Sequence, residues 1–135
     1  MYILDTDVLN KYIKGDAELC RRIDNTPGVF VCPITIYQAI RFSVATINKS
    51  HSPNSKLDRV RAFADFVRLL EALAKFPVAP YTPGAEVHFR EIVKVAGRVG
   101  REDCLIAACA KANDCTVVTY NITDFRQTTL SCESW

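Results

Sequence analysis

Short apolar segments alternate with longer helical ones along this chain, and this alternation constrains the fold more than any other feature. The segments YIL (2–4), VFVC (29–32) and TVVT (116–119) are short, apolar and bounded by polar or turn residues, as buried strands are. Helical patterns separate them. This order predicts an α/β domain with three α/β/α layers, in which helices cover both faces of a short-stranded, mainly parallel central sheet.

Local signals predict the remaining elements. We expect helices over residues 7–13, 17–24, 34–49, 56–76, 84–97 and 104–112. Asp7 is expected to cap the first of them, and Pro83 suits the first turn of another. VAPY (78–81) is a candidate strand, YNITDF (120–125) is predicted as a loop, and LSC (130–132) as a short last segment.

The segment 56–76 shows the clearest helical periodicity. Two pairs of opposite charge, each four residues apart, support its exposed face. They are Arg61 with Asp65 and Glu71 with Lys75. The apolar residues at helical spacing are Leu57, Val60, Ala64, Val67, Leu70 and Ala74.

Length and composition indicate one ordinary globular domain over residues 1–135. A net charge of +2 does not by itself indicate a nucleic-acid partner. No apolar run approaches the roughly 20 residues that a transmembrane helix needs, so no membrane association is expected. The six cysteines form no CxxC pair, and no apolar leader follows Met1. We therefore expect reduced thiols and a cytoplasmic protein.

Acidic residues stand at three of the predicted strand-to-helix junctions. Asp5 and Asp7 follow the first strand, Asp103 begins the helix after Glu102, and Asp124 lies just beyond TVVT. In a doubly wound sheet such junctions meet at one edge, where functional crevices lie. Clustered carboxylates repel each other unless a cation neutralises them, and Mg²⁺ or Mn²⁺ prefers oxygen ligands. The pattern predicts a divalent metal site suited to phosphodiester hydrolysis.

Each acid also has a purely structural interpretation. Asp7 is suited to a helix cap, Glu102 and Asp103 to the positive end of a helix dipole, and Asp124 to an Asx-turn. The residues alone leave these alternatives open.

Four segments in the correct order resemble the PIN-domain family, and specifically its VapC-type toxin ribonucleases. YILDTDVL is similar to the opening LDTNVL of the family, and ITIYQAIRF to its T-x-x-E-L helix. DCLIAACA is similar to D-x-x-IAA-x-A, and VVTYNITDF to LVT-x-N-x-x-DF. The resemblance covers nearly the whole chain.

The resemblance implies that Asp5, Asp103 and Asp124 bind Mg²⁺ or Mn²⁺ and position the attacking water. It also implies supporting roles for Thr119 and Asn121, which would hydrogen-bond around the site, and for Thr6 beside them. Proteins of this type are endoribonucleases that commonly cut structured RNA such as tRNA. They typically form homodimers and are silenced by a small antitoxin protein.

One departure from the family concerns Gln38, which stands where the family has glutamate. The site thereby loses one negative charge. Asp7 replaces a neutral family residue only two positions from Asp5, so we hypothesise that Asp7 compensates for Gln38 and is a further metal ligand. The alternative is a PIN-fold module that binds RNA or the antitoxin but cleaves weakly.

Basic and aromatic residues suggest contacts with partners. Arg41, Arg98 and Arg101 are candidates for binding RNA phosphates. Arg90, Lys94 and Arg98 share one face of the helix predicted over 84–97, where a solvated face is the alternative interpretation. The aromatic residues that could pack in the core, in a dimer or against an antitoxin are Tyr37, Phe63 and Phe66.

A remote alternative comes from the match of DTDVL to the D-x-D-x-[TV] opening of haloacid-dehalogenase-type phosphatases. There Asp5 would be a nucleophile and Asp7 a general acid or base. This interpretation needs a downstream acidic pair where TYNITDF offers one aspartate, and it leaves the other three PIN-like segments unexplained.

Overall fold

A computed structural model describes all residues from Met1 to Trp135. Seven helices and four strands follow one another in an α/β order. They are β1 (Tyr2–Leu4), α1 (Thr6–Ile13), α2 (Ala17–Asp24), β2 (Val29–Phe30), α3 (Pro33–Ser50), α4 (Arg59–Leu73), α5 (Pro83–Val95), α6 (Arg101–Ala112), β3 (Thr116–Val118), α7 (Ile122–Gln127) and β4 (Cys132–Glu133).

The four strands form one sheet in the order β2-β1-β3-β4, and every pair is parallel. Ile3 of β1 lies opposite Phe30 on one side and Val117 on the other. Because β1 and β3 are neighbours, the chain segments that leave their carboxyl ends emerge side by side. The sheet therefore brings together residues more than a hundred positions apart in the sequence.

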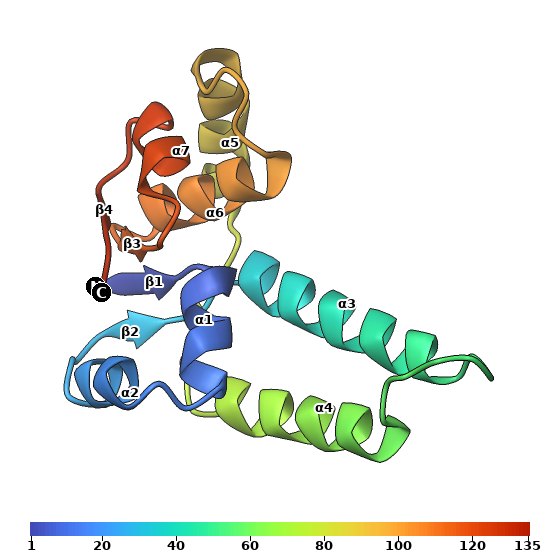
Figure 1. The fold of residues 1–135 in the computed structure, drawn as a ribbon. Helices are drawn as coiled ribbons and strands as arrows, with labels where there is room; N and C mark the ends of the chain where they lie inside the picture. The colour runs from blue at the N-terminus through green and yellow to red at the C-terminus, as the bar shows by residue number, and fades with distance from the viewer.

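Helices cover both faces of this sheet, which confirms the predicted α/β/α architecture (Figure 1). Ile3 and Val117 pack in a cluster with residues of α5, α6 and α7, including Phe125. Leu4 and Val118 point to the other face and pack against α1 and α2. This alternation follows from the two-residue period of a strand, and both strands are buried on both faces.

Helices α3 and α4 form an antiparallel pair that projects away from the sheet (Figure 1). Ala39 and Leu69 anchor the pair to the sheet through a small cluster with Leu9 and Val31. The apolar stripe that predicts α4 is largely solvent-exposed, and Val60 is 79% exposed. Phe66 lies against the anchoring cluster, whereas Phe63 and Tyr37 are exposed.

Three local predictions were wrong. VAPY forms no strand, only a single bridge between Val31 and Val78. Residues 122–127, predicted as part of a loop, form α7, which is too short for helical periodicity to show and is held by the fully buried Phe125. Helix α1 begins at Thr6, with Asp5 rather than Asp7 as its cap.

All six cysteines carry free thiols. None of the helices combines the length and the apolar character needed to cross a bilayer.

We predict that Phe125→Ala destabilises the protein by about 3–5 kcal/mol, because the side chain is completely buried and its removal leaves a cavity. Urea denaturation at neutral pH measures the free energy of unfolding. Phe42→Ala is the matched control, since Phe42 is 70% exposed and its truncation should change stability little. Equal losses in the two variants would contradict the described core.

Candidate active site

Asp5 occupies the point where β1 ends and α1 begins. Its backbone N–H donates to the carbonyl of Val118 at 2.9 Å, which extends the pairing of β1 with β3 by one residue. Its carboxylate accepts from the backbone N–H of Thr6 at 2.6 Å and from Thr119 Oγ1 at 2.8 Å. Only 6% of Asp5 is exposed. The carboxylate is thus buried at the carboxyl end of β1, where Asp5 also caps the N-terminus of α1.

The surroundings of Asp5 disfavour its charged form. Burial raises its pKa to about 6, and the negative charge of Asp7 adds to the rise, with a smaller contribution from Asp103. The hydrogen bonds from Thr119 and Thr6 act in the opposite direction but do not cancel the effect. The environment of Asp5 therefore favours either protonation of its carboxylate or a cation bound beside it.

Asp7 lies in the first turn of α1 and connects two segments. Its carboxylate accepts from the backbone N–H of Val8 at 2.6 Å and from that of Tyr120 at 3.0 Å. The second bond ties α1 to the segment that follows β3. Burial raises the pKa of Asp7, although these hydrogen bonds oppose the shift.

Asp103 and Asp124 lie in the first turns of α6 and α7, and one amide group joins them. Asn121 Nδ2 donates to Asp124 Oδ2 at 2.8 Å and, more weakly, to Asp103 Oδ2 at 3.3 Å. Burial raises the pKa of Asp103, and the charges of Asp124 and Asp7 raise it further. The three acidic segments therefore meet in space, as the strand-end argument predicts.

The hydroxyl group of Thr119 links Asp5 to the backbone of Asn121. Thr119 Oγ1 donates to Asp5 and accepts from the backbone N–H of Asn121 at 2.9 Å. Thr119 is fully buried, so its hydroxyl is fixed by these two partners. Thr119 and Asn121 thus orient the carboxylates on both sides of the site.

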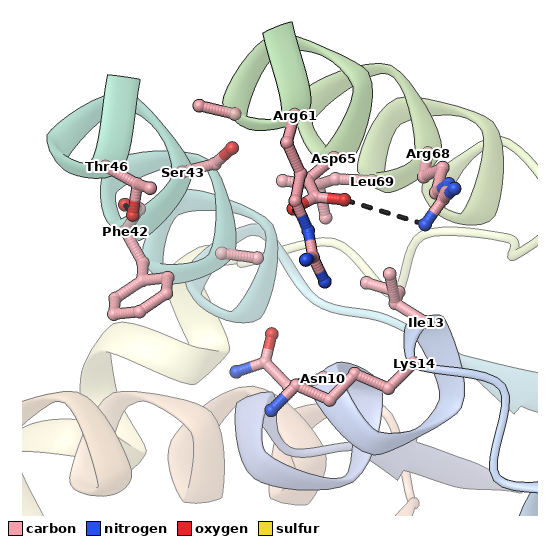
Figure 2. Close-up of a pocket in the computed structure, with 12 residues that line it drawn as sticks. Asn10, Ile13, Lys14, Phe42, Ser43, Thr46, Arg61, Asp65, Arg68 and Leu69 are labelled. Carbon is pink, nitrogen blue, oxygen red and sulfur yellow. Dashed lines mark hydrogen bonds and ion pairs between the residues drawn. The ribbon is translucent and has the colours of Figure 1, made fainter. Parts of the chain in front are cut away.

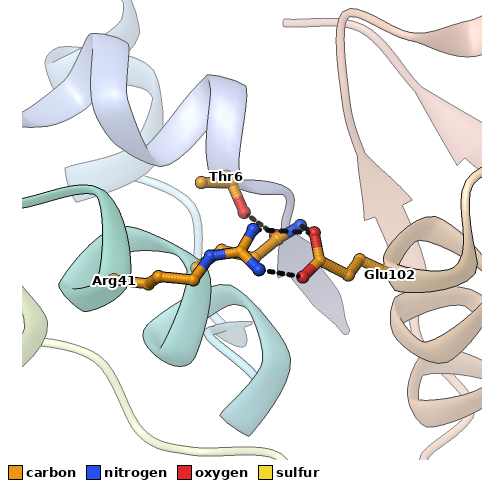
Figure 3. A network of polar contacts seen from close by, with 4 residues as sticks. Thr6, Arg41 and Glu102 are labelled. Carbon is orange, nitrogen blue, oxygen red and sulfur yellow. Dashed lines mark hydrogen bonds and ion pairs between the residues drawn. The ribbon is translucent and has the colours of Figure 1, made fainter. Parts of the chain in front are cut away.

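Gln38 belongs to a second polar network, with Thr6, Arg41 and Glu102. Figure 3 shows how these last three residues lie. It accepts a short hydrogen bond from Thr6 Oγ1, and its Nε2 donates to Glu102 Oε2 at 2.8 Å. Arg41 forms an ion pair with Glu102, with Nη1 2.9 Å from Oε1 and Nη2 3.2 Å from Oε2. A glutamate at position 38 would be repelled by the carboxylate of Glu102. Glutamine can accept from Thr6 and donate to Glu102 at the same time.

Two polar residues near the site, Glu102 and Thr35, were not predicted as site residues. Glu102 was placed beside Asp103 at a strand-to-helix junction but was given no role of its own in the site, although that position was a usable signal. Thr35 is fully buried, and its Oγ1 donates to the carbonyl of Leu4 at 3.0 Å. It therefore fixes the start of α3 against the end of β1, one turn before Gln38.

The basic helical face predicted for Arg90, Lys94 and Arg98 does not form as a whole. Helix α5 ends at Val95, so Arg98 lies in the following turn and not on the predicted helical face with Arg90 and Lys94. Arg90 is paired with Glu86, 3.1 Å away. Arg101 begins α6 and is exposed, with its guanidinium carbon 5.7 Å from the ring centre of Phe89.

The donor chemistry of the four aspartates fits a hard divalent cation. None of Asp5, Asp7, Asp103 and Asp124 forms an ion pair with a Lys or Arg side chain, and their partners are hydroxyl, amide and backbone donors. Carboxylate oxygens are ligands that Mg²⁺ and Mn²⁺ favour. As the side chains stand, however, no group of three or more His, Cys, Asp or Glu residues is arranged to hold an ion.

A hollow of about 340 Å³ lies elsewhere, between α1, α3 and α4 (Figure 2). Asn10, Phe42 and Arg61 are among the residues that line it. Asp65 and Arg68 also line it and form an ion pair, with Oδ1 3.6 Å from Nη1. None of the four aspartates lines this hollow. It is therefore distinct from the acidic site.

Comparison with known proteins identifies the family. The family model described as "PIN domain" matches residues 2–129, and the chain therefore belongs to the PIN-domain family. This membership leaves no support for the phosphatase interpretation of DTDVL. No match was found among curated proteins.

Solved structures with the same fold come from toxin-antitoxin complexes. A chain of VapBC2 from Rickettsia felis, bound to a promoter DNA fragment, is 19% identical with a TM-score of 0.79, over 99% of this chain and 98% of that one. A chain of DNA-bound VapBC from Salmonella typhimurium is 24% identical with a TM-score of 0.78, over 99% and 97%. A chain of VapBC-5 from Mycobacterium tuberculosis is 22% identical with a TM-score of 0.65, over 98% and 94%.

We predict that Asp5 makes the protein less stable as pH rises in the presence of a chelator. The folded-state pKa of about 6 exceeds the ordinary value of 3.8, so folding favours the protonated form. The stability that this proton provides is complete below about pH 4 and is lost as pH rises through about 6. The loss is on the order of 3 kcal/mol, since each pKa unit corresponds to about 1.4 kcal/mol.

Urea denaturation between pH 4 and pH 7 in EDTA measures this effect. Asp5→Asn should be more stable than the natural protein at pH 7, and its advantage should shrink toward pH 4. Parallel stability profiles for the two proteins would show that burial of Asp5 has no such electrostatic cost.

Proposed function

We propose that this protein is a VapC-type toxin, an endoribonuclease that depends on Mg²⁺ or Mn²⁺ and acts in the cytoplasm. The observation that carries the proposal is the meeting of four aspartates, from three separate segments, without any Lys or Arg partner. Burial raises the pKa values of Asp5, Asp7 and Asp103, and repulsion from neighbouring carboxylates adds to the rise at Asp5 and Asp103. A purely structural cluster would gain stability from cationic partners, whereas a cluster that binds a divalent ion must leave its oxygens available.

In this proposal Asp5, Asp103 and Asp124 hold the ion, and Asp7 adds a fourth negative charge. The bound ion would activate a water molecule and stabilise the charge that develops on the phosphodiester. Thr119 and Asn121 orient the carboxylates through the hydrogen bonds described above. Thr6 connects this group to Gln38 and so fixes α3 beside it.

RNA, an antitoxin and a second copy of the chain are the proposed partners. Structured RNA such as tRNA is the proposed substrate, with Arg41, Arg98 and Arg101 as candidate phosphate contacts. Fold neighbours from four bacterial sources are described as VapBC complexes, which supports a small antitoxin protein as a partner. The exposed apolar residues of α3 and α4, such as Phe42 and Val60, offer surface for a protein contact.

The neutral Gln38 favours one alternative, a PIN-fold module that binds RNA or an antitoxin but cleaves weakly. In this structure Gln38 donates to Glu102, which is also neutralised by Arg41. If the charge missing at position 38 is essential, the site has too little negative charge to hold its ion. The nuclease proposal instead assigns that charge to Asp7.

We predict that the purified protein cleaves tRNA in the presence of Mn²⁺ and that Asp5→Asn or Asp103→Asn reduces cleavage at least 100-fold. Single-turnover assays on a denaturing gel measure the rate. Phe63→Ala is the control, because Phe63 is exposed on α4 outside the site. Equal cleavage by all variants would reveal a contaminating nuclease, and cleavage only after Gln38→Glu would favour the weakened module.

Asp7→Asn tests the compensation in the same assay. The single variant should lose most of the activity, and the double variant Asp7→Asn with Gln38→Glu should regain part of it, because the total charge is restored. Full activity of Asp7→Asn would show that Gln38 needs no compensation.

A further inference from the structure

A second hollow, of about 480 Å³, lies directly beside the acidic site. Its walls come from the first turns of α3, the segment before α5, and the first turns of α6. Glu102 lines it and is followed in the chain by Asp103. The volume falls within the range of roughly 300–1,000 Å³ that is typical of ligand sites. The hollow is therefore large enough for one ring system next to the candidate metal ligands.

The lining combines flat and apolar side chains with two charged ones. Tyr37 and Tyr81 contribute aromatic rings, and Ile34 and Leu105 contribute aliphatic surface. Arg101 and Glu102 are the charged residues of the lining. This combination suits a flat ring with apolar faces and a polar edge, carried on a negatively charged backbone.

Arg41 contacts both Tyr37 and Glu102 and so holds their side chains in place. The guanidinium carbon of Arg41 lies 5.3 Å from the ring centre of Tyr37, so one face of the ring is covered by a cation. The same Arg41 pairs with Glu102, whose Oε2 also accepts from Gln38. A carboxylate has about four acceptor positions, so Glu102 can still accept from the edge of a ligand. Tyr37 is nevertheless 57% exposed, which leaves ring surface available.

We propose that this hollow binds one unpaired nucleobase of the RNA, next to the phosphate that the aspartates address, with Tyr37 as the stacking surface. The inference rests on the proposed ribonuclease function, because it assigns the base pocket of that site. Arg101 and Arg41 attract the adjoining phosphates, and Glu102 accepts from a ring or amino N–H of the base. A base that is stacked in a duplex cannot enter, so the pocket selects single-stranded loops or ends.

Fluorescence of 2-aminopurine, which falls when this base stacks, tests the proposal directly. The probe is a single-stranded RNA oligonucleotide with one 2-aminopurine, and all proteins carry Asp5→Asn to prevent cleavage. The parent should quench the probe, Tyr37→Phe should do so equally, and Tyr37→Ala should bind roughly 5- to 150-fold more weakly with little quenching, since stacking contributes about 1–3 kcal/mol per base. Phe63→Ala, another exposed aromatic, should behave as the parent.

The outcomes separate this proposal from the nuclease proposal. Tyr37-dependent quenching in the Asp5→Asn background, together with no RNA cleavage by the natural protein, supports the pocket and refutes the nuclease. Cleavage by the natural protein without any Tyr37-dependent quenching refutes the pocket alone. A change of oligomeric state in Tyr37→Ala, measured by sedimentation, with unchanged RNA affinity would assign the hollow to a second copy of the chain and overturn the proposal.

Discussion

The burial of the Asp5 carboxylate at the carboxyl end of β1 is the constraint on which the rest of the site depends. The charge is held by three features of the fold: the N-terminus of α1, the hydroxyl of Thr119 and the pairing of β1 with β3. None of these supplies a full positive charge, since a helix N-terminus offers only a partial one. Asp7 and Asp103 add further negative charge, so the folded chain carries an electrostatic cost that binding of a cation would remove.

Two polar networks surround Asp5, and each fixes a different part of the site. Thr119 and Asn121 connect Asp5 to Asp103 and Asp124 and are fixed by the turn after β3. The second network joins Gln38 and Arg41 of α3 to Glu102 of α6. It borders the hollow that Tyr37 and Glu102 line. The first network explains how the carboxylates are presented. The second explains why a neutral residue is tolerated at position 38. A glutamate there would be repelled by Glu102, whereas Gln38 donates a hydrogen bond to it.

The fold and the meeting of the aspartates were predictable, because both follow from where short apolar strands end. Asp5, Asp103 and Asp124 each adjoin a strand or begin a helix, and a parallel sheet brings such positions to one edge. The cap at Asp5, the short helix α7 and the exposed turn of Arg98 were missed, since hydrophobic periodicity does not fix where a helix starts, where it ends or whether a six-residue helix forms. The end of α5 is instead marked by Gly97, whose φ is +58°. The role of Glu102 was also missed, because its partners Gln38 and Arg41 lie more than sixty residues away in the chain.

The most direct test of this account is the ¹³C NMR titration of the Asp5 carboxyl carbon, first in EDTA and then with Mg²⁺. We expect a midpoint near pH 6 without the ion, because burial and the charge of Asp7 raise the pKa of this group. With Mg²⁺ the midpoint should move to lower pH, since a bound cation favours the carboxylate. An ordinary midpoint near 3.8 in EDTA, or a midpoint that Mg²⁺ leaves unchanged, would contradict the claim that this buried charge exists to bind a cation.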